Sequence, residues 1–400
     1  MRFEKAHIPY GAYWSTPFCK WQGSLSNQNA VSLAGAVARD ILAQRKISAR
    51  DLDGLVVGMT VPQKHALYAA PWLAALIGAE GITGPIVSQA CATGARVLAA
   101  AGAEVESAGR RTLLAVTTDR CSNGPHIYYP SPQGPGGTGD KEDWVLDSFG
   151  HDPWAKNSML QTAENVAAEA KISRKEQDDL TLIRAGQYQD ALAQDAAFLR
   201  RFMVWPLEVK DARGRVVATI LGDEGVFPTT AEGLAGLKPL LPDGTVTFGS
   251  QTHPADGNCG LIVCDRERGR ALSKDPSIEV QVVSYGQARA KRGFMAMATV
   301  PAARAALEAA GSSIRQIKVI KTHNPFAVND VYFAREMDVE VQAFNNYGSS
   351  LIYGHPQGPT GTRLIIETIE ELAMKGGGLG LFVGCAAGDT AAAVVVRVGR

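Results

Sequence analysis

The order of apolar runs in this 400-residue chain repeats, and the repeat limits the folds that the chain can adopt. Between about residues 28 and 120, segments with helical patterns alternate with short strand patterns at 54–58 and 112–116. The same order returns in residues 278–400, beginning with a predicted strand at 278–284. Strands that alternate with helices in two copies favour two α/β units packed against each other. We therefore predict an α/β protein with two similar halves.

The segment between these halves differs in composition. Residues 128–137 are rich in Pro and Gly, which disfavour regular elements, so a loop is predicted there. One interpretation is a flexible surface excursion. The other is a cover over a substrate or an oligomer contact, because long ordered loops in compact domains are usually functional. Five aromatic residues in this stretch or shortly after it are candidates to line a pocket: Tyr128, Tyr129, Trp144, Phe149 and Trp154.

Cys91 lies where a reactive thiol is expected. A short apolar run at 85–89 precedes it, and an alanine-rich helical pattern at 95–109 follows a turn of small residues. A helix N-terminus favours the thiolate, and its free N–H groups can hold an oxyanion, so we expect a lowered pKa for Cys91. The alternative is a cysteine that only packs, because free cysteines are among the most buried residues.

Three residues near the other end of the chain occupy similar positions. His323 follows an apolar run at 317–320, His355 lies in a Gly-rich loop before a helix, and Cys385 ends an apolar strand pattern. Together with Cys91 they suit a site in which one cysteine is acylated while other groups move protons.

Composition excludes several classes of partner. Forty acidic residues balance forty basic residues, so the net charge indicates neither nucleic acid nor an anionic membrane as a partner. The chain shows no apolar run of the roughly 20 residues that a membrane helix needs, and its start lacks the apolar core of a signal peptide. A cytoplasmic location is expected.

The six cysteines show no CxxC pair and are expected to be reduced thiols. Cys259 and Cys264 lie in an apolar strand pattern and are predicted to pack in the core, and Cys121 is expected to be structural. Because neither His nor Cys pairs have the spacing of metal ligands, no metal site is predicted.

Several separated motifs resemble the thiolase family, which makes or cleaves β-ketoacyl-CoA thioesters. The similarity runs nearly from end to end and is carried by Cys91-Ala92-Thr93-Gly94, the segments 122–126 and 249–252, the Gly354-His355-Pro356 block and Cys385. The resemblance implies duplicated α/β halves in a five-layered αβαβα body with an inserted loop domain. The implied domains are an N-terminal half at 1–120 completed by 249–268, a loop domain at 121–248, and a C-terminal half at 269–400.

The resemblance also implies a reaction and its residues. The activity would be CoA-dependent cleavage of a β-ketoacyl-CoA, or the reverse Claisen condensation, through an acyl group on Cys91. His355 would be the base for Cys91, Cys385 would exchange the α-carbon proton, and His323 with His355 would hold the enolate oxygen. Residues implied on the CoA side are Met159, Ser250, Thr252, Phe326 and Ala387. Coenzyme A and acyl-CoA would be substrates with no permanently bound cofactor, and a homodimer or homotetramer is expected.

The chain departs from the family pattern at several positions. His323-Asn324-Pro325-Phe326 replaces an Asn-Glu-Ala-Phe-like motif and resembles the sterol-carrier type of thiolase. Ala387 replaces a Gly, Phe227 an Arg near the CoA nucleotide, and Ser158 a His. These changes suggest an uncommon substrate. The five aromatic residues named above, with His323 beside them, suggest a bulky or aromatic acyl group; the alternative is that these aromatic residues pack under the loop as its own small core. Two alternatives stay open: a condensing subunit that needs a small zinc-ribbon partner protein, and a catalytically silent subunit.

Overall fold

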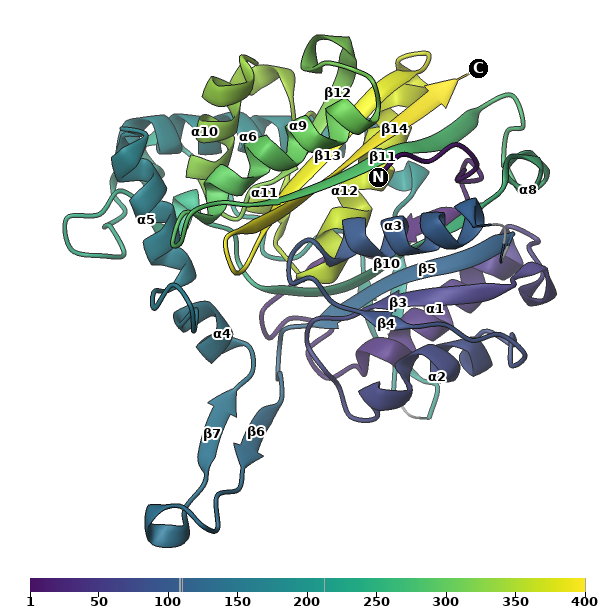
Figure 1. The fold of residues 1–400 in the computed structure, drawn as a ribbon, viewed down its shortest axis with the longest axis horizontal. Helices are drawn as coiled ribbons and strands as arrows, with labels where there is room; N and C mark the ends of the chain where they lie inside the picture. The colour runs from purple at the N-terminus through teal and green to yellow at the C-terminus, as the bar shows by residue number, and fades with distance from the viewer. Residues whose placement is uncertain (108, 110, 212, 400) are drawn as a thin grey trace.

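Two β-sheets form the centre of the molecule, which is described by a computed structural model over residues 1–107, 109, 111–211 and 213–399 (Figure 1). In the first sheet β3 is parallel to β4 and β5, and β10 runs antiparallel to β5. Its order is β1 (Tyr13–Ser15), β10 (Ala255–Cys264), β5 (Thr112–Arg120), β3 (Gly54–Gly58) and β4 (Ile86–Val87), with β2 (Cys19–Lys20) also paired to β10. The second sheet has the order β11 (Glu279–Arg289), β14 (Thr390–Gly399), β13 (Gly378–Ala386) and β12 (Ile317–His323).

Helices cover both sheets in five layers, which confirms the predicted αβαβα arrangement (Figure 1). The helices α1 (Ala30–Gln44) and α2 (Ala69–Leu76) lie on the outer face of the first sheet, and α9 (Thr299–Ala309) and α10 (Ala327–Met337) lie on the outer side of the second. The central layer consists of α3 (Thr93–Glu106) and α12 (Gly358–Met374).

The central layer is packed tightly because small residues let the two helices approach. A Cβ on Gly94 of α3 would lie 2.4 Å from the backbone nitrogen of Thr362 on α12. Residues 358–373 of α12 are buried on every side, as expected for a helix between two sheets. This contact joins the two halves and fixes the loop before α12 close to the start of α3.

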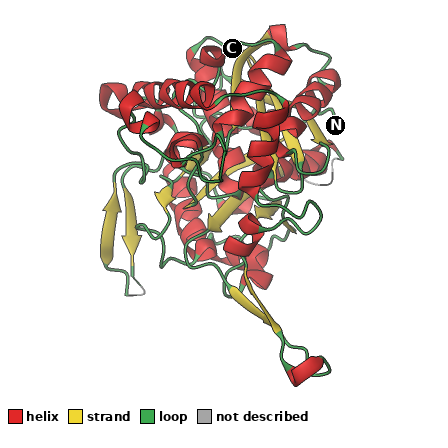
Figure 2. Ribbon diagram, turned by 90° about the vertical axis from the view of Figure 1, so that its left-hand side faces the viewer, coloured by secondary structure: helices red, strands yellow, loops and turns green. Residues whose placement is uncertain are grey.

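The segment between the halves carries two hairpins that project from the body (Figures 1 and 2). The first pairs β6 (His126–Tyr129) with β7 (Asp140–Asp143), and the second pairs β8 (Leu207–Lys210) with β9 (Val216–Ile220). The prediction of a loop throughout 128–137 was therefore wrong at Tyr128 and Tyr129, because cross-strand pairing to Lys141 and Asp140 overrides the local composition.

The same segment is fixed to the body through a buried ion pair. The guanidinium of Arg363 on α12 donates to both oxygens of Asp223 at 2.7 and 2.8 Å, and both side chains are fully buried. Tyr188, on α6 (Arg174–Ala196), also donates to Asp223. Asp223 thus connects two parts of the segment to the central helix.

The remaining helices are short or lie at the periphery: α4 (Leu146–Gly150), α5 (Met159–Glu169), α7 (Ala231–Ala235), α8 (Arg266–Ala271) and α11 (Ser350–Tyr353). Within the described residues, none of the helices combines the length and apolar character needed to cross a membrane. Cys121, Cys259 and Cys264 are buried, in agreement with their predicted packing roles. The domain boundaries given above stay predictions.

Candidate active site

Four chain segments bring the predicted catalytic residues to one place. Cys91 follows β4, and His323 is the last residue of β12. Because β12 and β13 are parallel and pair His323 with Gly384, the next residue, Cys385, lies at the same end of the sheet. His355 lies in the loop between α11 and α12.

The thiol of Cys91 is held as a neutral group. Its Sγ donates to Oε1 of Gln357 at 3.2 Å. Burial raises the pKa of Cys91 to about 12, although the backbone N–H groups of Ala387 and Cys91 act in the opposite direction. The prediction of a lowered pKa was therefore wrong, because desolvation of the thiolate outweighs the nearby N–H donors.

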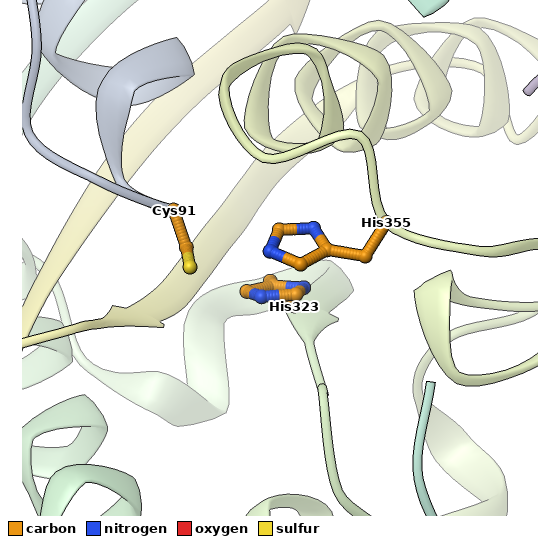
Figure 3. A group of neighbouring side chains, drawn as sticks. All are labelled: Cys91, His323 and His355. Atoms are coloured by element: carbon orange, nitrogen blue, oxygen red, sulfur yellow. The ribbon is translucent and has the colours of Figure 1, made fainter. Parts of the chain in front are cut away.

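The two histidines stack beside this thiol (Figure 3). Their ring centroids are 4.0 Å apart with an interplanar angle of 30°. Nδ1 of His355 lies 2.6 Å from the hydroxyl of Thr360, and Nδ1 of His323 lies 2.8 Å from that of Ser350. Burial lowers the pKa of His323 to about 3 and that of His355 well below its ordinary value, so both rings are neutral at neutral pH.

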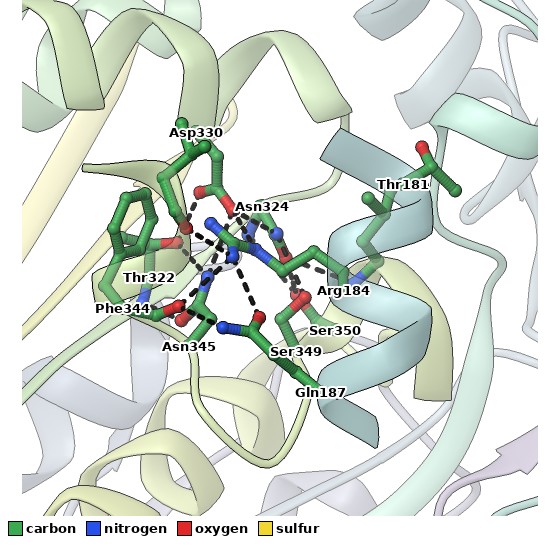
Figure 4. Close-up of polar contacts among 12 residues, drawn as sticks. Thr181, Arg184, Gln187, Thr322, Asn324, Asp330, Phe344, Asn345, Ser349 and Ser350 are labelled. Carbon is green, nitrogen blue, oxygen red and sulfur yellow. Dashed lines mark hydrogen bonds and ion pairs between the residues drawn. The ribbon is translucent and has the colours of Figure 1, made fainter. Parts of the chain in front are cut away.

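The hydrogen bonds around Ser350 and Asn324 (Figure 4) favour one tautomer of His323, whose Nδ1 contacts the Ser350 hydroxyl. The Asn324 amide group donates to Asp330 and Ser349, so its Oδ1 is the acceptor that faces Ser350. Every contact of Ser350 is satisfied when its hydroxyl donates to Asn324 Oδ1 and accepts from Nδ1–H of His323. We therefore assign the proton of His323 to Nδ1, which leaves a lone pair on Nε2.

A buried ion pair supports this arrangement from behind (Figure 4). Nε of Arg184 lies 2.9 Å from Asp330, and neither side chain is exposed. Asp330 also accepts from Thr322, Asn324 and Asn345. The carboxylate thus fixes Asn324, and through it Ser350 and the ring of His323.

Cys385 is fully buried near Cys91 and receives a hydrogen bond from the side-chain amide of Asn329 at 3.1 Å. Burial, and to a smaller extent Cys91, raises the pKa of Cys385 well above its ordinary value. Its resting form is a neutral thiol that can give up a proton.

Gln357 and Asn329 are site residues that the sequence reasoning missed. Gln357 has φ 58° and ψ −107°, a conformation that few residues other than glycine adopt, and its side chain is buried. The backbone N–H of the following Gly358 donates to Asp119 of β5 at 2.9 Å, which fixes the loop. A polar side chain directly after His355-Pro356 was the available signal. Asn329 gave none, because its position follows only from the packing of α10.

A cavity of about 580 Å³ opens beside Cys91 and His355. Among the residues predicted on the CoA side, Met159, Thr252, Phe326 and Ala387 line it. Ser250 is fully buried in a turn, where its hydroxyl accepts from the backbone N–H of Thr247. Ala387 lacks a positive φ, so alanine is unstrained at this position.

Two of the five aromatic residues considered for the pocket contribute to it. Trp144 and Phe149 line the cavity and also pack on a small cluster with Val61, and Nε1 of Trp144 donates to the Thr60 carbonyl at 2.8 Å. Tyr128, Tyr129 and Trp154 are 54%, 47% and 61% exposed. Assigning these three to the pocket was wrong, since the projecting hairpin carries both tyrosines into solvent and Trp154 lies on the surface.

Comparisons with known proteins agree with this geometry. Residues 12–267 match the family model described as "Thiolase, N-terminal domain" and residues 277–398 match "Thiolase, C-terminal domain". The chain is 28% identical over 398 residues to the 3-oxoadipyl-CoA/3-oxo-5,6-dehydrosuberyl-CoA thiolase of Escherichia coli, covering 96% of this chain and 97% of the relative. It is 27% identical over 390 residues to the mitochondrial 3-ketoacyl-CoA thiolase of Homo sapiens, covering 96% of each chain.

Solved structures show the same fold. The crystal structure of human mitochondrial 3-ketoacyl-CoA thiolase in complex with CoA superposes with a TM-score of 0.89 at 26% identity, covering 99% of both chains. The acetyl-CoA acetyltransferase of Bacillus anthracis gives a TM-score of 0.90 at 24% identity, also over 99% of both chains.

Proposed function

The chain belongs to the thiolase family, and on that premise we propose that it cleaves a β-ketoacyl-CoA with coenzyme A, or runs the reverse condensation, through an acyl group on Cys91. The observation that carries the proposal is the position of the Cys91 thiol beside two neutral imidazoles and near a second, buried thiol, with Cys91 and His355 at the wall of one cavity. Such a set can take up and return protons while a covalent intermediate divides the reaction into two steps.

In the first step, the Cys91 sulfur attacks the β-carbonyl carbon and its proton passes to Nε2 of His355, which has no hydrogen-bond partner among the described residues. The backbone N–H groups of Cys91 and Ala387, which already interact with the sulfur, are suited to hold the oxygen that becomes negative.

In the second step, the bond between the α- and β-carbons breaks and the acyl group stays on Cys91. The departing enolate takes a proton at its α-carbon from Cys385, whose resting form is the neutral thiol. Nε2 of His323 carries a lone pair in the assigned tautomer, so it can donate to the enolate oxygen only through water or after taking up a proton. The thiol of coenzyme A then attacks the acyl group and its proton passes to the Cys385 thiolate. The bond between the acyl carbon and Cys91 breaks, and Cys91 takes its proton back from His355.

We propose an uncharged and bulky acyl group. The lining residues within the described chain are apolar or neutral apart from the ionisable Cys91 and His355, so a carboxylate in this cavity would lack a partner cation. Trp144 and Phe149 provide aromatic surface for packing. An acyl group such as that in the name of the Escherichia coli relative, 3-oxoadipyl, is disfavoured on this reasoning.

The condensing subunit with a zinc-ribbon partner is not favoured, because the relatives that match this chain over nearly their whole length are named as thiolases.

A homodimer is proposed because β4 is an edge strand of the first sheet and carries Ile86, which is 40% exposed. Light scattering at several concentrations tests this state. A cytoplasmic location stays a prediction from the sequence.

Mass spectrometry tests the reaction directly. The protein is incubated with acetoacetyl-CoA, benzoylacetyl-CoA and 3-oxoadipyl-CoA, and the peptide that contains Cys91 is examined for an added acyl group. We expect acylation at Cys91 with the uncharged esters and its loss in Cys91→Ala. Acylation at another residue, or turnover by Cys91→Ala, would contradict the proposal.

A further inference from the structure

Three atoms at the site are arranged as ligands for a metal ion. Sγ of Cys91 and one ring nitrogen from each of His323 and His355 lie within 4.8 Å of one another. The sequence spacing predicted no metal site, since the three residues are far apart in the chain, but the fold brings them together (Figure 3). Zn–N and Zn–S bonds of roughly 2.0–2.3 Å place the ligand atoms of a tetrahedral site about 3.3–3.5 Å apart. Binding therefore requires these atoms to approach by up to about 1.5 Å and the two stacked rings to turn toward one ion.

Both imidazoles present an available nitrogen. Nε2 of His323 and Nε2 of His355 have no hydrogen-bond partner among the described residues, and the two side chains are at least nine-tenths buried. Each ring is oriented by a hydroxyl on Nδ1, from Ser350 and Thr360 respectively. A hydrogen bond on the opposite nitrogen is the usual support of a metal-ligating histidine, because it fixes the tautomer and the direction of the lone pair.

The chemistry of the three ligands selects the ion. One thiolate and two neutral imidazoles suit Zn²⁺, and the cavity beside Cys91 leaves room for a fourth ligand from solvent. His323 supplies the third ligand, and it stands where the thiolase pattern has an amide. Two ligands alone would hold zinc far less tightly.

We propose that Cys91, His323 and His355 bind Zn²⁺ and that the bound ion inhibits the enzyme reversibly. On binding, the Cys91 S–H bond breaks, an S–Zn bond forms, and the proton is released to solvent. Zinc and an acyl group both require Sγ of Cys91, so they exclude each other. The binding itself does not depend on the acyl-transfer reaction, since it needs only the three side chains.

Cobalt titration tests the site without turnover. Co²⁺ is added to metal-free protein, and the thiolate-to-cobalt charge-transfer band and the visible bands of tetrahedral Co²⁺ are followed by absorption. We expect one equivalent to bind and Zn²⁺ to displace it. His323→Asn should weaken binding at least about tenfold, Cys91→Ser should abolish the charge-transfer band, and His126→Asn, a change on the exposed hairpin, should alter neither.

Alkylation provides a second test in the unaltered chain, in case a variant fails to fold. Zn²⁺ should protect Cys91 from iodoacetamide, and protein already alkylated at Cys91 should lose the cobalt bands. Failure to see the bands, bands that persist after alkylation, or equal cobalt affinity in a folded His323→Asn protein would overturn the proposal. Acylation of Cys91 is measured separately, in the presence of a chelator that removes zinc. The acyl-transfer proposal can therefore fail while zinc binding is observed, and the reverse.

Discussion

The side-chain oxygen of Gln357 lies 3.2 Å from Sγ of Cys91 and accepts a hydrogen bond from its thiol. The contact is made from a backbone conformation, φ 58° and ψ −107°, that directs the Gln357 amide toward the Cys91 thiol. A neutral acceptor of this kind stabilises the thiol relative to the thiolate, and it acts in the same direction as burial.

Gln357→Met should therefore make Cys91 more reactive in the substrate-free protein. Removing one neutral hydrogen bond changes the free-energy difference between the thiol and the thiolate of Cys91 by about 0.5–1.5 kcal/mol, which raises the thiolate fraction up to roughly tenfold. Gln357→Glu is the matched variant, because a carboxylate beside the sulfur should slow the reaction instead. Rates of iodoacetamide labelling at Cys91 measure both. Equal rates in the three proteins would mean that the amide does not control the thiol.

The pH dependence of labelling follows from the raised pKa of Cys91, which is about 12. Below a pKa the thiolate fraction rises tenfold per pH unit, so the labelling rate should still be rising steeply between about pH 7 and 9. An ordinary cysteine, with a pKa near 8.5, levels off above about pH 9. A plateau in the labelling rate of Cys91 below pH 8 would show that the helix N-terminus, and not burial, has the larger effect on the pKa of Cys91.

The site residues could be predicted where a local pattern marked them. Cys91, His323, His355 and Cys385 each follow an apolar run or lie just before a helix. The ends of the parallel strands β12 and β13 bring His323 and Cys385 to one edge of the second sheet, whereas Cys91 follows β4 of the first sheet. The electrostatics could not be predicted, because the desolvation of Cys91 depends on residues from distant segments. The close approach of Cys91, His323 and His355 could not be predicted from the sequence either, because it arises only when β4, β12 and α12 come together in the fold.

Substrate choice should respond to Trp144 and not to Trp154. Trp144 lines the cavity and is fixed by its hydrogen bond to Thr60, whereas Trp154 is 61% exposed. Trp144→Ala should lower kcat/KM for benzoylacetyl-CoA relative to acetoacetyl-CoA by several-fold, in line with about 0.5–1.5 kcal/mol for a stacked ring pair. Trp154→Ala should leave the ratio unchanged. The opposite ranking would place the acyl group outside this cavity.

Stability should depend strongly on the buried pair of Arg184 and Asp330. Asp330→Asn leaves the guanidinium buried without its counter-charge, which typically costs 3–5 kcal/mol. The matched control is Asp179→Asn, which breaks an exposed pair with Lys175 and should change the free energy of unfolding by less than about 1 kcal/mol. Urea unfolding followed by circular dichroism measures both. A loss of less than 1 kcal/mol in Asp330→Asn would show that the hydrogen bonds around Asp330 do not need its charge.

Cys385 should be needed for α-proton exchange and not for acylation of Cys91. In Cys385→Ala, the Cys91 thiol and the imidazoles remain, so acyl-CoA should still acylate Cys91. Exchange of the α-protons of acyl-CoA with deuterated solvent should fall by at least about a hundredfold, as expected for the loss of a positioned general acid or base. Asn329→Ala removes the amide that donates to Cys385 and should give a smaller loss of exchange with acylation intact. Retained exchange in Cys385→Ala would mean that another base performs the α-carbon step, with the unpartnered Nε2 of His323 as the first candidate.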